Sequence, residues 1–134
     1  MSFHGHTARK RFGQHWLRDA AVLDRILEAA DLQPQDRVLE VGPGRGALTD
    51  RLLASSAAAV HAVELDRDLV TGLQQRFENQ PRFSLTQGDV LEVPLLLPDA
   101  CPAGKVVANI PYTITGPVLD RLIGRLDQPV DPPY

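Results

Sequence analysis

The chain alternates continuous apolar runs with longer amphipathic runs, and this alternation predicts its elements. Apolar residues at helical spacing favour helices over residues 20–31, 46–56, 66–79 and 116–126. Short apolar runs predict strands over residues 37–41, 60–65, 83–86 and 105–108. Strands that alternate with helices indicate an α/β fold with about four parallel strands and helices on both faces. In such sheets ligands bind beyond the carboxyl ends of the strands, so the polar residues that follow each strand are the functional candidates.

Composition fits one globular domain. The 134 residues are 43% hydrophobic and 23% charged, which allows both a core and a solvated surface. No apolar run approaches the roughly 18 residues of a membrane span, and the N-terminus lacks a signal core. Cys101 is the single cysteine and cannot form an internal disulfide, which fits a reducing cytoplasm. The cysteine and the four histidines show no metal-ligand spacing. We therefore expect a cytoplasmic monomer without metal or membrane contact.

Charge and proline divide the chain into three segments. Residues 1–18 carry four basic residues and no acid, although the whole chain has a net charge of −3. This basic arm favours a polyanion partner, and a solvated terminus is the alternative. Residues 19–126 hold the predicted α/β domain. Residues 127–134 contain three prolines and predict an irregular tail.

The first predicted strand ends in a glycine-rich turn, Gly42-Pro43-Gly44-Arg45-Gly46. Glycine lets the backbone turn sharply and approach a ligand, and the following helix offers free N–H groups. Such a turn can also be purely structural. The spelling G-P-G-R-G-A further fits the dinucleotide pattern G-x-G-x-x-A, so NAD is an alternative ligand at this point.

Acidic residues follow the second and third predicted strands. Glu64 lies 22 residues beyond Gly42, a spacing at which a carboxylate accepts hydrogen bonds from ribose hydroxyls. Asp66 is the expected cap of the next helix. Asp89 follows the third strand, where it can accept from an adenine amino group or cap the short turn after it. The glycine turn and Glu64 together predict an adenosine-containing cofactor.

The fourth predicted strand ends in Asn109-Ile110-Pro111-Tyr112. The Asn109 side chain and the Ile110 carbonyl can accept both N–H bonds of an adenine amine, which frees the nitrogen lone pair for attack. Pro111 fixes the turn, and the Tyr112 ring offers a face on which an extruded base stacks. An ordinary strand exit with a half-buried tyrosine is the alternative.

Five stretches occur in the order found in one enzyme family. They read ARKRFGQHWL (8–17), VLEVGPGRGALT (38–49), AVELDRDL (62–69), QGDVL (87–91) and ANIPYTIT (108–115). In these stretches the chain resembles the rRNA adenine N6,N6-dimethyltransferases from about residue 4 to residue 123, and most of all those acting on bacterial small-subunit (16S) rRNA. The combination of the arm with NIPY disfavours NAD.

The resemblance implies a Rossmann-like methyltransferase fold that binds S-adenosylmethionine (SAM). The residues that it assigns to the cofactor are His15, Leu17, Gly42, Glu64, Asp89 and Asn109. It places the methionine part near Gly42, the ribose at Glu64 and the adenine at Asp89. It makes Asn109, Ile110, Pro111 and Tyr112 the reacting centre. His15 departs from the family, which often has asparagine there, and an imidazole still offers one hydrogen bond.

The implied activity is dimethylation of two adjacent adenines in small-subunit rRNA, with the small ribosomal subunit as partner. Family members continue well beyond residue 134, so we expect an N-terminal part of the enzyme with a truncated sheet. Two alternatives stay open. One is a large-subunit rRNA methyltransferase of the macrolide-resistance type, and the other is a non-catalytic fragment that binds SAM or RNA.

Overall fold

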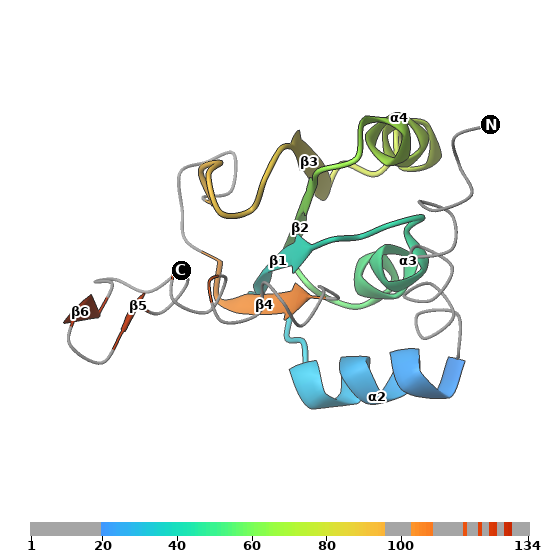
Figure 1. The fold of residues 1–134 in the computed structure, drawn as a ribbon. Helices are drawn as coiled ribbons and strands as arrows, with labels where there is room; N and C mark the ends of the chain where they lie inside the picture. The colour runs from blue at the N-terminus through green and yellow to red at the C-terminus, as the bar shows by residue number, and fades with distance from the viewer. Residues whose placement is uncertain are drawn as a thin grey trace.

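A computed structural model describes residues 20–95, 103–108, 117, 121, 124–125 and 128–129. Four parallel strands form one sheet in the order β3-β2-β1-β4 (Figure 1). Their bounds are β1 Arg37–Val41, β2 Ala59–Glu64, β3 Phe83–Gln87 and β4 Lys105–Ala108. The α/β class and the four parallel strands predicted from the apolar runs are thus confirmed.

Three helices cover one face of the sheet (Figure 1). They are α2 Ala20–Ala30, α3 Ala47–Ala54 and α4 Arg67–Arg76. Leu23, Leu48 and Leu73 come from these helices and pack on Val38 and Val60 of the sheet. The helices end one to three residues inside the predicted ranges, because the amphipathic pattern continues into residues that only cap the last turn.

The opposite face of the sheet is covered by the connection between β3 and β4. Leu39 and Val63 pack there against Val90, Leu95 and Ala103, which lie in the connection between β3 and β4. The helices α2, α3 and α4 therefore all lie on the first face. Pro117 and Arg121 are helical. Arg121 Nη1 donates to the Val90 carbonyl at 2.7 Å, so this helical residue adjoins the connection on the second face.

Part of the C-terminal prediction is wrong. Gly124–Arg125 forms β5 and pairs antiparallel with Gln128–Pro129, which forms β6. The predicted helix 116–126 cannot include β5, and the predicted irregular tail contains β6. The spacing of two residues between these strands is that of a hairpin, and a glycine at position 124 disfavours a helix there.

Two basic side chains close helix ends. Lys105 Nζ donates to the carbonyls of Ala30 and Asp31, both at 2.7 Å, and pairs with Asp36 at 2.8 Å. The hydrogen bond from Lys105 is the main reason that the pKa of Asp36 is lowered. Arg82 donates to carbonyls at and beyond the end of α3, those of Leu53, Ser55 and Ala57. Cations at these positions satisfy carbonyls that a helix end leaves without partners.

A polar group is built into the second face. His61 on β2 is buried, and its two ring nitrogens lie 2.6 Å from Ser84 Oγ and 3.0 Å from Thr86 Oγ1. Burial lowers the pKa of His61, so the neutral imidazole is favoured. Both hydroxyls rotate to suit it, so the buried polar atoms of the ring are satisfied.

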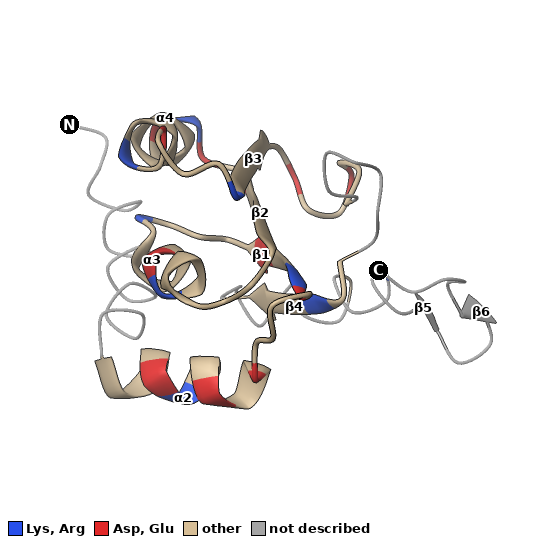
Figure 2. Ribbon diagram, turned by 180° about the vertical axis from the view of Figure 1, so that it is seen from behind, with Lys and Arg blue, Asp and Glu red and all other residues tan. Residues whose placement is uncertain are grey.

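Acidic residues recur along α2 (Figure 2). They include Asp24, which pairs with Arg51 of α3, and the exposed Glu28. Among the residues that the structure describes, no helix is long and apolar enough to cross a membrane.

Candidate functional site

The glycine turn between β1 and α3 combines an open position with a packed one. Gly42, Gly44 and Gly46 have φ values of 71°, 60° and 95°, which L side chains rarely adopt. Among the described residues, a Cβ on Gly44 would meet nothing within 4 Å, whereas a Cβ on Gly46 would lie 2.8 Å from Phe77 Cε2. Gly46 thus has a structural role against α4. Gly44 leaves its backbone open to a ligand.

Glu64 ties this turn to the end of β2. Its Oε1 accepts from the Gly44 N–H at 3.1 Å, and its Oε2 accepts from the Asp66 N–H at 2.9 Å. Its own carbonyl accepts from Gly88 N–H at 2.9 Å, which joins the end of β3 to the same edge. A carboxylate offers about four acceptor positions, so each oxygen keeps one for a ligand hydroxyl. The structure therefore brings the predicted ribose acceptor into contact with the predicted glycine turn.

Leu65 is a site candidate that the sequence reading missed. It is 68% exposed at the carboxyl end of β2, between Glu64 and Asp66. Asp66 Oδ1 accepts from the N–H groups of Asp68 and Leu69, so its predicted role as helix cap is confirmed. The available signal was an apolar residue between two acids at a strand end, where a solvated turn would be polar.

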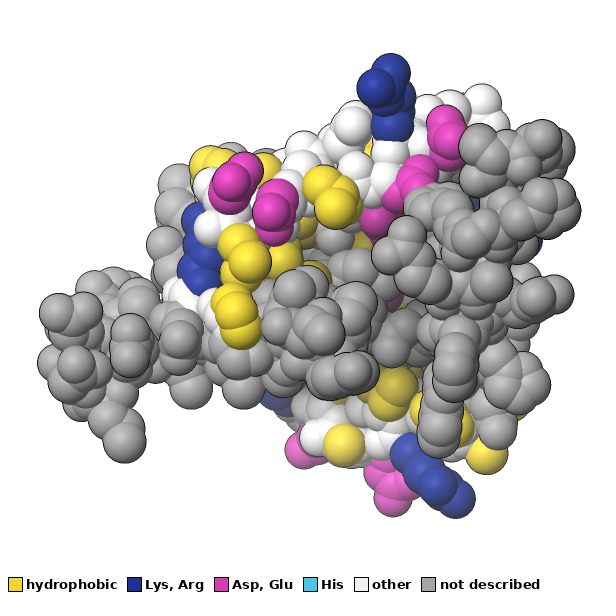
Figure 3. Space-filling view, viewed as in Figure 1, with side chains coloured by type: hydrophobic (Ala, Val, Ile, Leu, Met, Phe, Trp, Pro, Cys, Tyr) yellow, Lys and Arg dark blue, Asp and Glu magenta, His cyan; other side chains and the backbone are white. Residues whose placement is uncertain are grey.

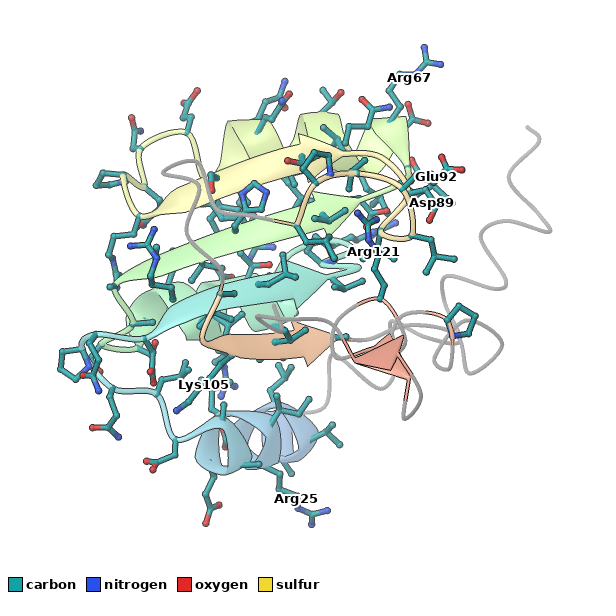
Figure 4. The ribbon with its side chains drawn as sticks, turned by 90° about the vertical axis from the view of Figure 1, so that its left-hand side faces the viewer. Arg25, Arg67, Asp89, Glu92, Lys105 and Arg121 are labelled. Atoms are coloured by element: carbon teal, nitrogen blue, oxygen red, sulfur yellow. The ribbon has the colours of Figure 1, made fainter. Side chains whose placement is uncertain are left out.

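Asp89 caps the short turn that follows it, which was the alternative to adenine recognition. Its Oδ1 accepts from Leu91 N–H at 2.9 Å, and its carbonyl accepts from Glu92 and Val93 N–H, also at 2.9 Å. In Figure 4 Asp89 and Glu92 lie at the carboxyl ends of the strands, with Arg67 above them. The cap fixes the carboxyl group at this edge. Adenine recognition by Asp89 stays a prediction.

A second carboxyl group lies beneath the glycine turn. Glu40 of β1 is 1% exposed, and its Oε1 accepts from the Thr49 hydroxyl of α3 at 2.6 Å. Burial raises the pKa of Glu40 to about 7, the Thr49 hydrogen bond opposes this, and the charge of Glu64 adds to it. The bond spans the turn from its entering strand to its leaving helix. No motif had singled out Glu40, although an acid inside the apolar run RVLEV was a visible anomaly.

Acidic and hydrophobic side chains lie close together on the face that looks along the strand ends (Figure 3). This mixture fits an adenosine-containing ligand, because carboxylates accept from hydroxyls and amino groups while Leu65 offers an apolar surface to a base. The open space at Gly44 leaves room for such a ligand beside Glu64. No cluster of three or more His, Cys, Asp or Glu residues that could hold a metal occurs within the described ranges.

The remaining predicted site residues lie outside the described residues. They are His15, Leu17, Asn109, Ile110, Pro111 and Tyr112. The strand that leads into the last four is described. Ala108, at its end, pairs with Val41 at the end of β1, directly before the glycine turn.

Comparison with known proteins is consistent with this geometry. The chain is 81% identical over its whole length to "Ribosomal RNA small subunit methyltransferase A" of Synechococcus sp. (strain WH7803), and it covers 48% of that protein. It thus spans about half the length of the curated relatives it matches. A solved dimethyladenosine transferase from Plasmodium falciparum is 29% identical with a TM-score of 0.69, over 82% of this chain and 38% of that one.

A solved RNA methyltransferase from Salinibacter ruber, in complex with S-adenosyl-L-homocysteine, is 25% identical with a TM-score of 0.59. The match covers 71% of this chain and 61% of that one. These neighbours support the Rossmann-like methyltransferase fold. The model of the family "Ribosomal RNA adenine dimethylase" matches residues 5–131, nearly the whole chain. The protein therefore belongs to the ribosomal RNA adenine dimethylase family.

Proposed function

We propose that this chain forms the cofactor-binding part of a SAM-dependent enzyme that dimethylates the N6 amines of adjacent adenines in small-subunit rRNA. The observation that carries the proposal is the pair of hydrogen bonds from the Gly44 and Asp66 N–H groups to Glu64. They hold one carboxylate between a glycine turn and a strand end, with an acceptor position free on each oxygen. That arrangement suits a ribose with two adjacent hydroxyls.

Leu65 and Asp89 suit the adenine of the same cofactor. Leu65 is exposed next to Glu64 and offers an apolar surface for a base. Asp89 Oδ1 is occupied by the Leu91 N–H, which leaves Oδ2 to accept from an exocyclic amine. By the family resemblance, the arm residues His15 and Leu17 complete the pocket, and Gly42 contacts the methionine part.

When bound, SAM supplies an electrophilic methyl group on a sulfonium. The residues of this chain have to bring an adenine amine in line with it. We assign Asn109 and the Ile110 carbonyl to the two N–H bonds of the amine, Pro111 to the turn that aims them, and Tyr112 to stacking on the base. Register supports this assignment, because the chain leaves β4 beside the start of the glycine turn.

The basic charge of the arm supports rRNA, the partner that the family resemblance implies. Arg9, Lys10 and Arg11 form a compact basic group in the arm. Clustered cations contact phosphates and position the RNA, whereas the choice of adenine belongs to the base-binding residues.

Calorimetry of SAM binding to the 134-residue chain tests the cofactor assignment. Glu64→Ala should weaken binding by about 1.5–3 kcal/mol, the scale of a charge-assisted hydrogen bond. Glu78→Ala is the matched control, because Glu78 is exposed beyond the far end of α4. Equal affinities of the two variants would remove Glu64 from the site.

Methyl transfer tests the substrate. The chain would be extended with the C-terminal half of the Synechococcus relative and given small ribosomal subunits that lack the adenine methyl groups. Asn109→Ala should abolish transfer and leave SAM affinity within about tenfold, since the contact belongs to the transition state. Preferred transfer to large subunits would favour the large-subunit alternative, and SAM binding without any transfer would favour the non-catalytic one.

A further inference from the structure

The carboxyl group of Glu40 is the most unusual buried group of the site. It lies in an apolar setting, with Ala62 of β2 and Val107 of β4 as its register neighbours. Thr49 of α3 provides its hydrogen bond at 2.6 Å. A carboxyl group so placed holds its proton up to about neutral pH, since burial raises its pKa to about 7.

The charged neighbour of Glu40 belongs to the cofactor site. Glu64 lies two residues beyond Ala62 on the same face of the sheet, and its charge adds to the raised pKa of Glu40. The helices packed on this face contribute apolar side chains, Leu23 from α2 and Leu73 from α4. His61 lies on the opposite face of the sheet, where its ring forms hydrogen bonds with Ser84 and Thr86. Among described residues, Glu64 is thus the charged group that acts on Glu40.

Two carboxyl groups therefore flank the glycine turn, Glu64 touching Gly44 and Glu40 bonding to the helix that leaves the turn. The proposed methyl donor carries a sulfonium cation, and the product left after transfer is a neutral thioether. A cation beside this pair favours the ionised form of both acids, whereas the thioether has no such effect.

We propose that Glu40 is a specificity-determining residue of the cofactor site, which distinguishes the cationic methyl donor from the neutral product by losing its proton when the donor binds. The inference rests on the proposed function. When the donor binds, protonated Glu40 becomes ionised and releases one proton to the buffer. After transfer the positive charge is gone, Glu40 regains a proton, and the product loses the favourable interaction that the donor had.

Isothermal titration calorimetry in two buffers of different ionisation enthalpy measures the proton count. At about pH 7, where half of Glu40 is protonated, Glu40 should release up to about half a proton more when SAM binds than when S-adenosylhomocysteine binds. The α-amino group titrates at lower pH in SAM than in S-adenosylhomocysteine, because the sulfonium disfavours a second positive charge, so its contribution is removed by comparison with a variant whose residue 40 cannot ionise. If the cation lowers the pKa of Glu40 by one unit, the preference for SAM should rise about fivefold between about pH 6 and pH 8.

Glu40→Gln is the decisive variant, because an amide keeps the acceptor for Thr49 and cannot ionise. It should abolish the extra proton release and flatten the pH dependence of the preference, while Glu28→Gln on the exposed side of α2 should change neither. His15 is unchanged in both variants, so its titration does not affect this comparison.

Equal proton counts for SAM in the unmodified chain and in Glu40→Gln would overturn the inference and leave the proposed function standing. If neither ligand binds, the proposed function fails, and the inference fails with it.

Discussion

Replacing Glu40 with Gln should make the stability of the chain less dependent on pH. In the folded protein the pKa of Glu40 is raised to about 7 from a usual value of 4.5, mainly by burial. The native state therefore binds more protons than the unfolded state between these two values. Stability from this group is fully present below about pH 4.5 and is lost as pH rises to about 7.

The magnitude follows from the shift. A shift of this size corresponds to about 3 kcal/mol at 1.36 kcal/mol per pKa unit. Between about pH 5.5 and pH 8, linkage predicts that the unmodified chain loses about 2 kcal/mol of unfolding free energy through Glu40. Gln has no proton to lose and keeps the acceptor for Thr49, so the variant should gain about 2 kcal/mol relative to the unmodified chain over this range.

Urea denaturation followed by circular dichroism at both pH values measures the difference. Comparing the change with pH removes any constant effect of the amide on packing. Glu78→Gln is the control, because that side chain is exposed. If the unmodified chain and Glu40→Gln lose stability in parallel across the range, Glu40 is ionised in the folded state and the reasoning from burial is wrong.

Three further predictions concern packing and caps. His61→Gln should reduce the loss of unfolding free energy as pH falls from about 7 to 5. Burial lowers the pKa of His61, so only the unfolded chain takes up a proton at this residue in that range. Urea denaturation curves with the same pH dependence in both proteins would contradict this. Gly46→Ala should lower the unfolding free energy by about 2 kcal/mol or more, because residue 46 has a left-handed backbone and its new Cβ would meet the Phe77 ring. Gly72→Ala should raise it by about 0.5–1 kcal/mol, because residue 72 lies inside α4 and a Cβ there meets no described residue. Similar melting temperatures for the two variants would refute this difference. Arg82→Ala should cost about 2–3 kcal/mol in denaturant unfolding because three carbonyls lose a charged donor, and a change below about 0.5 kcal/mol would show that water replaces it.

Much of the fold was predictable because local pattern and tertiary structure agree. The apolar runs of RVLEV and KVVA became β1 and β4 with the predicted bounds, since buried parallel strands require such runs. The pairing of β5 with β6 was missed because helical periodicity over residues 116–126 outweighed a single glycine. Periodicity also could not assign the helices to faces, because that depends on how the connections cross the sheet.

The site was predictable in part. A search for polar residues directly after each strand located Glu64 and the glycine turn. The hydrogen bond from Gly44 N–H to Glu64 joins residues 20 positions apart. The search offered turn capping only as an alternative role for Asp89, which the structure shows, and it did not reveal that Leu65 stays exposed. Glu40 was missed because a strand-end search ignores a residue inside a strand, although a buried acid is itself informative.

The hydrogen bonds of His61 have a consequence for strand alignment during folding. Ser84 and Thr86 alternate with Phe83 and Leu85 along β3. If β3 slipped by one residue, the imidazole would face apolar side chains and lose both partners, at about 1–3 kcal/mol for each unsatisfied atom. The misaligned sheet would thus be penalised by a polar group as well as by misplaced apolar ones. His61 therefore selects one alignment of an edge strand whose carboxyl end leads into the turn that contains Asp89.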